Sequence, residues 1–180
     1  MSWNDYYRRR DVIDEVLRHA RRDAGGPLPF DAVPGAAELF GTPENLLLAM
    51  HYRWRHTLGG RLRTTIGGPE ETGGIPGGGD SDDIDAVSRA WRSTVADNPV
   101  LRAVLDAHVD DHPELRRAHD AELRMLALTA GVAELGESDE EITEAGNALV
   151  TLMRARTAGG LGAPRRNPVG QLLRKLAPTG

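Results

Sequence analysis

Apolar residues recur at helical spacing in one segment after another, and this periodicity constrains the fold more than any other feature. At about 100° per residue, the apolar and aromatic positions of the first segment share one face of a helix. They are Tyr6, Ile13, Val16, Leu17 and Ala20. No segment alternates apolar and polar residues as a half-buried strand does, and there is no internal repeat. The sequence therefore predicts an all-α helical bundle of about five or six helices.

Glycine, proline and capping residues predict where the helices begin and end. Thr42 before Pro43 is typical of a helix start, and Asp111 followed by Glu114 matches a capping box. The glycine pair at 59–60 weakens or ends a helix. The expected helices cover residues 2–24, 42–58, 81–97, 99–111, 113–130 and 138–159, with a short helical turn over 36–40.

A glycine-rich stretch divides the chain. Residues 67–80 hold seven glycines and two prolines, a composition that cannot bury enough apolar surface to order itself. We therefore predict one helical domain over residues 1–157, made of helical lobes 1–66 and 81–157 joined by a flexible linker. Residues 158–180 carry four basic residues and no acid, and are predicted to form a flexible basic tail.

Charge and composition exclude several classes of function. The absence of cysteine excludes disulfides, cysteine zinc sites and thiol catalysis. Residues 67–157 carry a net charge of −11 and aromatics make up only 4% of the chain, so binding to nucleic acid is not expected. Without a signal peptide or a run of about 18 apolar residues, we expect a cytoplasmic protein with no membrane span. Twenty-one arginines against one lysine indicate a GC-rich, bacterial genome.

Residues 51–56, HYRWRH, place two histidines, two arginines, a tyrosine and a tryptophan in one helical segment. Their spacing sets His51 and His56 about 140° apart around the axis, so they do not share a metal ion unless the helix breaks. Trp54 lies on the apolar stripe of this helix, and His51 lies at the margin of the stripe. We interpret the segment as the edge of a core with solvated charges and an arginine packed on Trp54, with ligand binding as the alternative.

The residues at the start of the same helix resemble a short pattern of a known protein family. Residues 40–49, FGTPENLLLA, are similar to the F-x-S/T-x-E-x-L-L-x-A pattern that ends the DNA-binding region of TetR-type repressors, which are all-helical proteins with a C-terminal ligand domain. The resemblance implies a divergent helical transcriptional regulator. In that family a helix-turn-helix precedes the pattern, whereas here about seventeen residues with three prolines separate Ala24 from Phe40. Two helices and a turn need more chain, so membership is not assigned.

Three polar residues fall where the helical pattern calls for apolar ones. His108 lies on the apolar face of its helix, and His119 and Glu122 share the apolar face of the next one. A short turn joins these helices, so they are expected to pack together and bring the three side chains close. Two histidines and a carboxylate suit Zn or Fe, which makes His108, His119 and Glu122 the candidate metal ligands. The alternatives are a structural His119–Glu122 pair and a small-molecule pocket lined by these groups.

No catalytic motif accompanies these residues. The sequence lacks a GxSxG elbow, a phosphate-binding loop and a GxGxxG turn, and its serines and threonines have no activating neighbours. His119 and Glu122 suit a base and its orienting group, but a nucleophile is missing. We therefore expect a protein that is not an enzyme, and we predict no cofactor beyond the metal ion considered above.

The basic tail contains one amphipathic segment. Its apolar residues have the spacing of a helix that docks in a groove, and two basic residues lie off that face. The predicted partner-binding residues are Val169, Leu172, Leu173, Arg174, Lys175 and Leu176. A disordered tail, docking on the chain's own acidic bundle or exchange within a dimer, and recognition of an external partner are the open alternatives.

Two functions of different classes follow. The first is a non-catalytic cytoplasmic interaction protein, an adaptor or regulator, that binds a protein partner or a second copy of itself through its acidic bundle, its basic tail or both. The second is a small helical protein that binds a metal ion or a small ligand through His108, His119 and Glu122.

Overall fold

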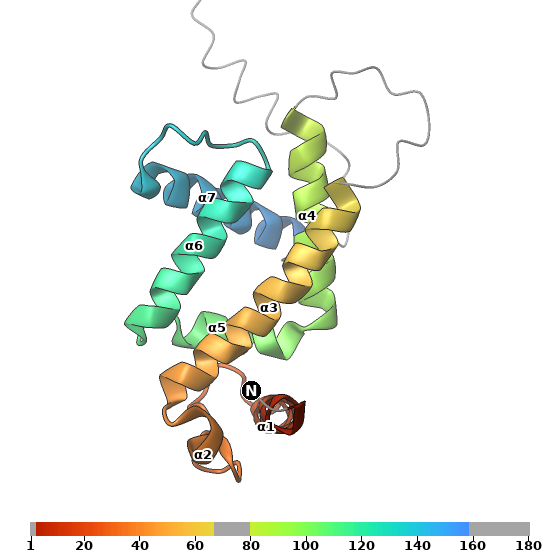
Figure 1. Ribbon diagram of the computed structural model, residues 1–180. Helices are drawn as coiled ribbons and strands as arrows, with labels where there is room; N and C mark the ends of the chain where they lie inside the picture. Colours follow the sequence, from red (N-terminus) through yellow and green to blue (C-terminus); the bar gives the residue numbers. More distant parts are fainter. Residues whose placement is uncertain (1–2, 67–79, 159–180) are drawn as a thin grey trace, which may run out of the picture.

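Helices form the framework of the protein. The computed structural model describes residues 3–66 and 80–158. Within these ranges there are seven α-helices and no strand (Figure 1). The helices are α1 (Trp3–Ala20), α2 (Ala36–Phe40), α3 (Pro43–Ile66), α4 (Asp80–Asp97), α5 (Pro99–His108), α6 (Pro113–Thr129) and α7 (Asp139–Ala158). The predicted all-α class is confirmed, and the five-residue α2 brings the number of helices above the five or six expected.

Two predicted segments lie outside the described ranges. The predicted linker falls on residues 67–80 and the predicted basic tail on residues 158–180, of which only Asp80 and Ala158 are described. In the part of the chain that is described, no helix combines the length and apolar character needed to cross a membrane. Between α1 and α3 the only helix is α2, which is shorter than the two-helix unit of a helix-turn-helix.

The longest helix, α3, organises the fold. It packs against α2, α4, α5 and α6, and it runs diagonally across Figure 1 between the lower and upper helices. Its predicted apolar stripe is confirmed, because every residue of the stripe is fully buried. These residues are Leu46, Leu47, Met50, Trp54 and Leu58.

The prediction that this helix ends near Leu58 is wrong. The helix continues through Gly59 and Gly60. Each glycine in a helix interior costs about 1 kcal/mol relative to alanine, whereas burying one leucine side chain contributes about 1.5–3 kcal/mol. Leu62, in the turn after the glycines, is only 5% exposed, and Arg61 bonds to two side chains of α4. Tertiary contacts of this turn therefore outweigh the low helix propensity of the glycines.

Side-chain caps form at the N-termini of α3 and α7 but not at that of α6. Thr42 Oγ1 accepts a hydrogen bond from the Asn45 backbone N–H at 3.2 Å. Ser138 and Glu141 form a capping box, in which each side chain accepts from the other's backbone N–H at 3.3 and 3.0 Å. At the start of α6, however, the residue before the helix is His112, which has an extended backbone and makes no side-chain cap. The capping box expected there does not form, because the N-cap position is His112 and Asp111 lies one residue before it, out of register with Glu114.

Close packing of α6 on α7 depends on one glycine. A Cβ atom at Gly146 would lie 2.2 Å from the carbonyl oxygen of Leu123, well inside the contact distance of real atoms. Only glycine allows the two backbones to approach this closely. The α6–α7 pair makes the most extensive helix contact of the fold and so fixes the face of α6 that remains for α3.

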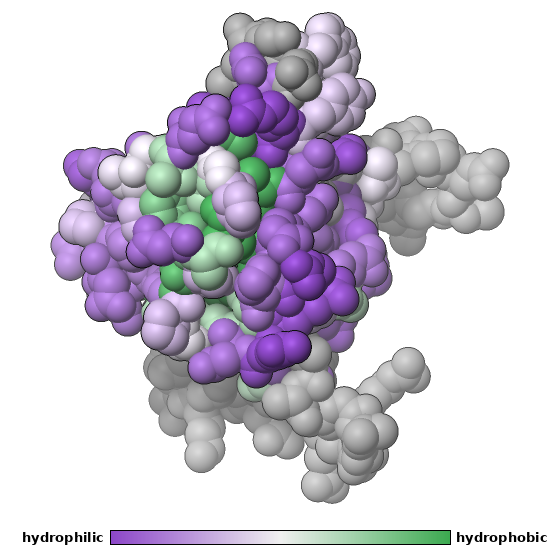
Figure 2. Space-filling model, turned by 90° about the horizontal axis from the view of Figure 1, so that it is seen from below, coloured by the Kyte–Doolittle hydropathy of each residue, from purple (hydrophilic) through white to green (hydrophobic). Residues whose placement is uncertain are grey.

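One main core joins the residues on both sides of the 67–79 segment. It draws side chains from all seven helices, among them Val16, Phe40, Trp54, Val87, Leu105, Leu126 and Met153. The end of the molecule that carries α1 and α2 is seen in Figure 2. On this face apolar residues gather into a central patch bordered by hydrophilic residues.

Candidate functional site

A buried carboxylate lies at the interface of α3 and α6. Glu122 of α6 is 1% exposed. Its Oε2 atom lies 2.9 Å from Nε2 of His51, and its Oε1 atom accepts a hydrogen bond from Nε1 of Trp54 at 2.8 Å. Both partners come from one turn of α3. A buried charge costs several kcal/mol unless it is paired and hydrogen-bonded, so these bonds are what allows a carboxylate at this position.

An arginine balances the charge of this carboxylate. Arg102 of α5, which is 5% exposed, donates from Nη1 to Glu122 Oε1 at 3.2 Å. Its guanidinium lies over the Trp54 ring, 5.1 Å from the ring centroid, as expected of an arginine packed on this tryptophan. On its other side Arg102 donates from Nε to Asp106 at 3.0 Å, and Asp106 accepts from Arg154 of α7 at 2.8 Å. Glu122, Arg102, Asp106 and Arg154 thus form a chain of alternating charges, and this chain links α5, α6 and α7.

The pKa values of the site reflect this arrangement. Burial alone would raise the pKa of Glu122, but the hydrogen bond from His51 and the positive charge of Arg102 outweigh it and lower this pKa from 4.5 to about 2. The pKa of His119, on the same helix, is lowered from its usual value of 6.5, first by burial and then by the charge of Arg102. At neutral pH the site therefore holds a charged Glu122 and a neutral His119.

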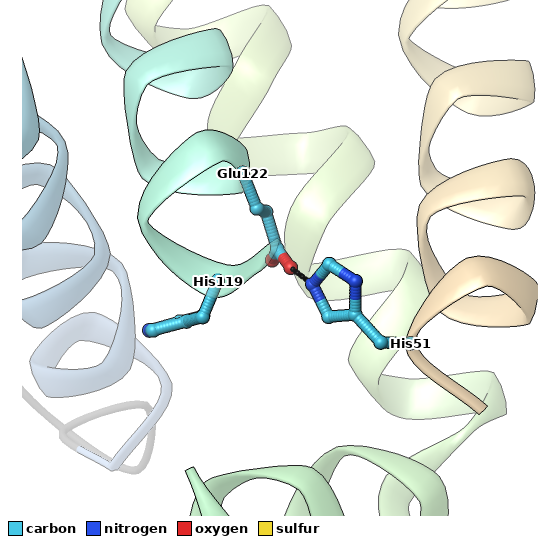
Figure 3. A group of neighbouring side chains, drawn as sticks. All are labelled: His51, His119 and Glu122. Atoms are coloured by element: carbon cyan, nitrogen blue, oxygen red, sulfur yellow. Dashed lines mark hydrogen bonds and ion pairs between the residues drawn. The ribbon is translucent and has the colours of Figure 1, made fainter. Parts of the chain in front are cut away.

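His51, His119 and Glu122 form a candidate metal centre. Each side chain offers one ligand atom, and these atoms all lie within 4.8 Å of one another. Figure 3 shows His51 reaching Glu122 from α3, whereas His119 projects from α6 itself. Nδ1 of His119 is buried and makes no hydrogen bond within the described part of the chain. His119 is therefore the histidine of this group whose ring nitrogen is available to bind a metal ion.

The structure brings together two of the three predicted ligands. His119 and Glu122 share this centre, but His108 does not belong to it. His108 lies in the last turn of α5, where its ring centroid is 6.1 Å from that of His112 and it has a backbone hydrogen bond with Gly26. The third residue of the candidate metal centre is His51 of α3. Glu122 also pairs with His51 and not, as the structural alternative had it, with His119.

Two residues of this site escaped the sequence analysis as partners of Glu122. His51 was placed at the margin of its apolar stripe, and nothing in one helix shows which other helix will cover that margin. Arg102 carries a usable signal, because it precedes Asp106 by four residues and Leu105 by three. An i, i+4 ion pair beside an apolar face is typical of an arginine at the edge of a core.

A second candidate site is an open groove between α1 and α3, called here the α1–α3 groove. It has a volume of about 510 Å³. Its two walls carry aromatic and basic side chains, namely Tyr6, Arg9 and Arg10 of α1 and Tyr52, Arg53 and His56 of α3. Ile13, Phe40 and Ala49 contribute apolar surface. The combination of exposed aromatic rings and arginines over an apolar base is typical of a binding surface.

The tail residues predicted to bind a partner cannot be placed beside these sites. Val169, Leu172, Leu173, Arg174, Lys175 and Leu176 all lie outside the described residues.

Among known proteins, the chain matches no protein-family profile, no curated protein and no solved structure.

Proposed function

We propose that this chain is a non-catalytic interaction protein, an adaptor or regulator, that binds an acidic segment of a partner protein in the α1–α3 groove. The observation that supports this proposal is the exposure of the aromatic side chains around the groove. Tyr52 is 72% exposed and Tyr6 is 58% exposed, and Trp3 and Tyr7, on the same helix as Tyr6, are 79% and 47% exposed. Tyrosine, tryptophan and arginine are the residues most enriched among binding hot spots.

The charge of the groove favours an anionic partner. Arg9, Arg10 and Arg53 line it, and none of its lining residues is acidic. Arg9 donates to the backbone carbonyl of Leu39 at 3.0 Å, a bond that leaves its charge unneutralised. Arg53 is paired with Asp14, and both of these side chains are partly exposed. Exposed ion pairs contribute little and exchange readily, so a partner carboxylate can replace Asp14.

The apolar base of the groove favours a partner segment that also carries an apolar anchor. Ile13 and Phe40 are each 6% exposed and close the groove toward the core. A volume of about 510 Å³ is enough for a few side chains and too small for a folded domain to enter. An acidic amphipathic helix or strand, with an aromatic or aliphatic residue facing inward, has the matching chemistry. The acidic bundle and the basic segment over residues 169–176 stay predictions for additional contacts.

Panning a random-peptide display library on the full-length protein tests this proposal. Phage that bind the Tyr6→Ala/Tyr52→Ala variant are removed first, so that only groove-dependent peptides remain. We expect the enriched peptides to combine Asp or Glu with aromatic or aliphatic residues and to bind the double variant at least about 10-fold more weakly, since each hot-spot residue contributes about 2 kcal/mol or more. Binding should also weaken at high salt.

Leu135→Ala provides the matched control. Leu135 is 88% exposed, and it lies between α6 and α7, outside the residues that line the groove. This variant should bind the selected peptides as the wild type does. Enrichment of basic or uncharged peptides, or no peptide that distinguishes the wild type from the double variant, would contradict the proposal.

A further inference from the structure

We propose that His51, His119 and Glu122 bind one divalent transition-metal ion of the zinc class at the buried α3–α6 interface. This site is separate from the α1–α3 groove, and the inference does not depend on the function proposed for the groove. It assigns a different ligand set from the one that the sequence predicts, with His51 in the place of His108.

The donor atoms have the right chemistry and spacing. Two imidazole nitrogens and one carboxylate oxygen form a known ligand set for Zn²⁺ and Fe²⁺, in which a water molecule fills the open coordination position of a tetrahedral ion. Ligand atoms bound at about 2.0–2.2 Å to one tetrahedral ion are about 3.4 Å apart. Here the three atoms lie within 4.8 Å of one another, and His51 Nε2 and Glu122 Oε2 are already 2.9 Å apart. Binding an ion therefore requires His51 and Glu122 to separate slightly, because 2.9 Å is shorter than the spacing of two ligands of one ion.

The hydrogen-bond count leaves room for the ion. An ionised carboxylate offers about four acceptor positions, two on each oxygen. On Glu122, Trp54 and Arg102 occupy Oε1, while His51 alone bonds to Oε2. One acceptor position on Oε2 is thus left, and the neighbouring Nδ1 atom of His119 is buried without a partner. A cation between these two atoms satisfies both of them. His51 becomes the third ligand when its ring proton lies on Nδ1, so that the metal ion replaces its hydrogen bond to Glu122.

The local charge also permits a divalent cation. Arg102 would repel it, but Arg102 is paired with Asp106 at 3.0 Å. Arg154 also pairs with Asp106, but its side chain is 47% exposed, so solvent screens its charge. The buried charge closest to the ion is then the Glu122 carboxylate, which is one of its ligands.

Two further side chains act as outer-shell partners. Trp54 and Arg102 hold Oε1 of Glu122 and so direct Oε2 toward the histidines. Hydrogen bonds of this kind fix the orientation of a ligating carboxylate, and they raise the affinity of the site for its metal. Their burial, at 0% and 5% exposure, also keeps water from competing for the carboxylate.

Metal titration of the full-length protein tests the inference. The protein is dialysed against a chelator, freed of it, and titrated with Co²⁺ and then with Zn²⁺, monitored by visible absorption and calorimetry. We expect one ion per chain, the absorption of tetrahedral cobalt, and its loss when Zn²⁺ is added. His119→Gln and His51→Gln should each weaken binding by more than about 100-fold, because removal of a ligand exceeds the 10–100-fold effect of an outer-shell change.

Two histidine variants serve as matched controls. His108→Gln and His112→Gln should bind Co²⁺ as the wild type does. His119→Gln is the decisive variant, since the Nδ1 atom it removes makes no hydrogen bond and the fold should survive, which circular dichroism verifies. Absence of tetrahedral cobalt absorption in the wild type would overturn the inference, as would unchanged affinity in His119→Gln or loss of binding in His108→Gln.

Discussion

The two faces of α3 use neighbouring residues in opposite ways. On the inner face, His51 and Trp54 are 3% and 0% exposed and both bond to Glu122. On the outer face, Tyr52 and Arg53 lie between them in sequence but line the α1–α3 groove. The inner residues have their partners within the chain, so their loss should act on stability. Tyr52 is 72% exposed and Arg53 has only a partly exposed ion pair with Asp14, so the loss of these residues should act on binding.

Removing the charge of Glu122 is expected to have the largest effect on stability. In Glu122→Gln, Arg102 keeps its ion pair with the partly exposed Asp106 but loses its bond to the buried carboxylate, and the NH₂ group of the new amide cannot accept the hydrogen bonds that one carboxylate oxygen accepts in the wild type. Breaking one side of a buried ion pair costs about 3–5 kcal/mol. Urea unfolding should show a decrease of this size in the free energy of unfolding.

A double-mutant cycle tests whether the pair is the cause. Arg102→Met keeps much of the side-chain volume and removes the guanidinium. If Glu122 and Arg102 stabilise each other, adding Arg102→Met to Glu122→Gln should cost at least about 1 kcal/mol less than the sum of the single effects. Strict additivity would show that the inner face depends on packing alone.

Acid should reproduce part of this loss without any substitution. The pKa of Glu122 is about 2 in the folded protein against 4.5 as its reference, so the stabilisation is complete above pH 4.5 and is lost as the pH falls toward 2. A shift of this size corresponds to about 3 kcal/mol. The pKa of His119 is lowered as well, so its neutral form is favoured by folding and its contribution begins to fall below pH 6.5.

Chemical unfolding at a series of pH values separates the two groups. Glu122→Gln should flatten the decline below pH 4.5, and His119→Gln should flatten the part that begins below pH 6.5. If the free energy of unfolding of a variant follows the wild-type curve over the pH range assigned to the substituted residue, that residue does not titrate as the structure implies.

The sequence predicts the inner face of α3 only in part, and for a physical reason. Helical periodicity marks Trp54 as buried, and it marks Glu122 as polar on an apolar face. It gives angles within one helix, however, and no information on which helices meet. His51 and Glu122 are 71 positions apart, so their pairing depends on the packing of α6 against α3. His108 lies away from this centre because α5 packs on α1, α3 and α4 and not along α6, so the short turn between α5 and α6 does not make the expected helix pair.

A change on the same helix is expected to increase stability slightly. Gly60 lies inside α3, and a Cβ atom added there would meet no atom within 4 Å. Gly60→Ala should therefore raise the free energy of unfolding by about 0.5–1 kcal/mol, the usual difference between these residues in a helix. Gly146→Ala is the contrasting variant, since its Cβ atom would collide with the Leu123 carbonyl, and it should destabilise the protein. A destabilised Gly60→Ala would mean that α3 bends at the glycine pair in solution.

The outer face should give the smallest change in stability and the clearest change in binding. Tyr52 makes one ring contact, with His56 at 6.3 Å between centroids, and remains 72% exposed. Tyr52→Ala should therefore change the free energy of unfolding by less than about 0.5 kcal/mol, because exposed substitutions rarely cost more. The same variant should weaken a groove-selected acidic peptide at least about 10-fold in a calorimetric titration. A large loss of stability would show that Tyr52 packs in the core, as His51 does. If both the free energy of unfolding and the affinity for the peptide are unchanged, the exposed Tyr52 side chain does not bind the peptide. The outer face of α3 would then have no role in binding.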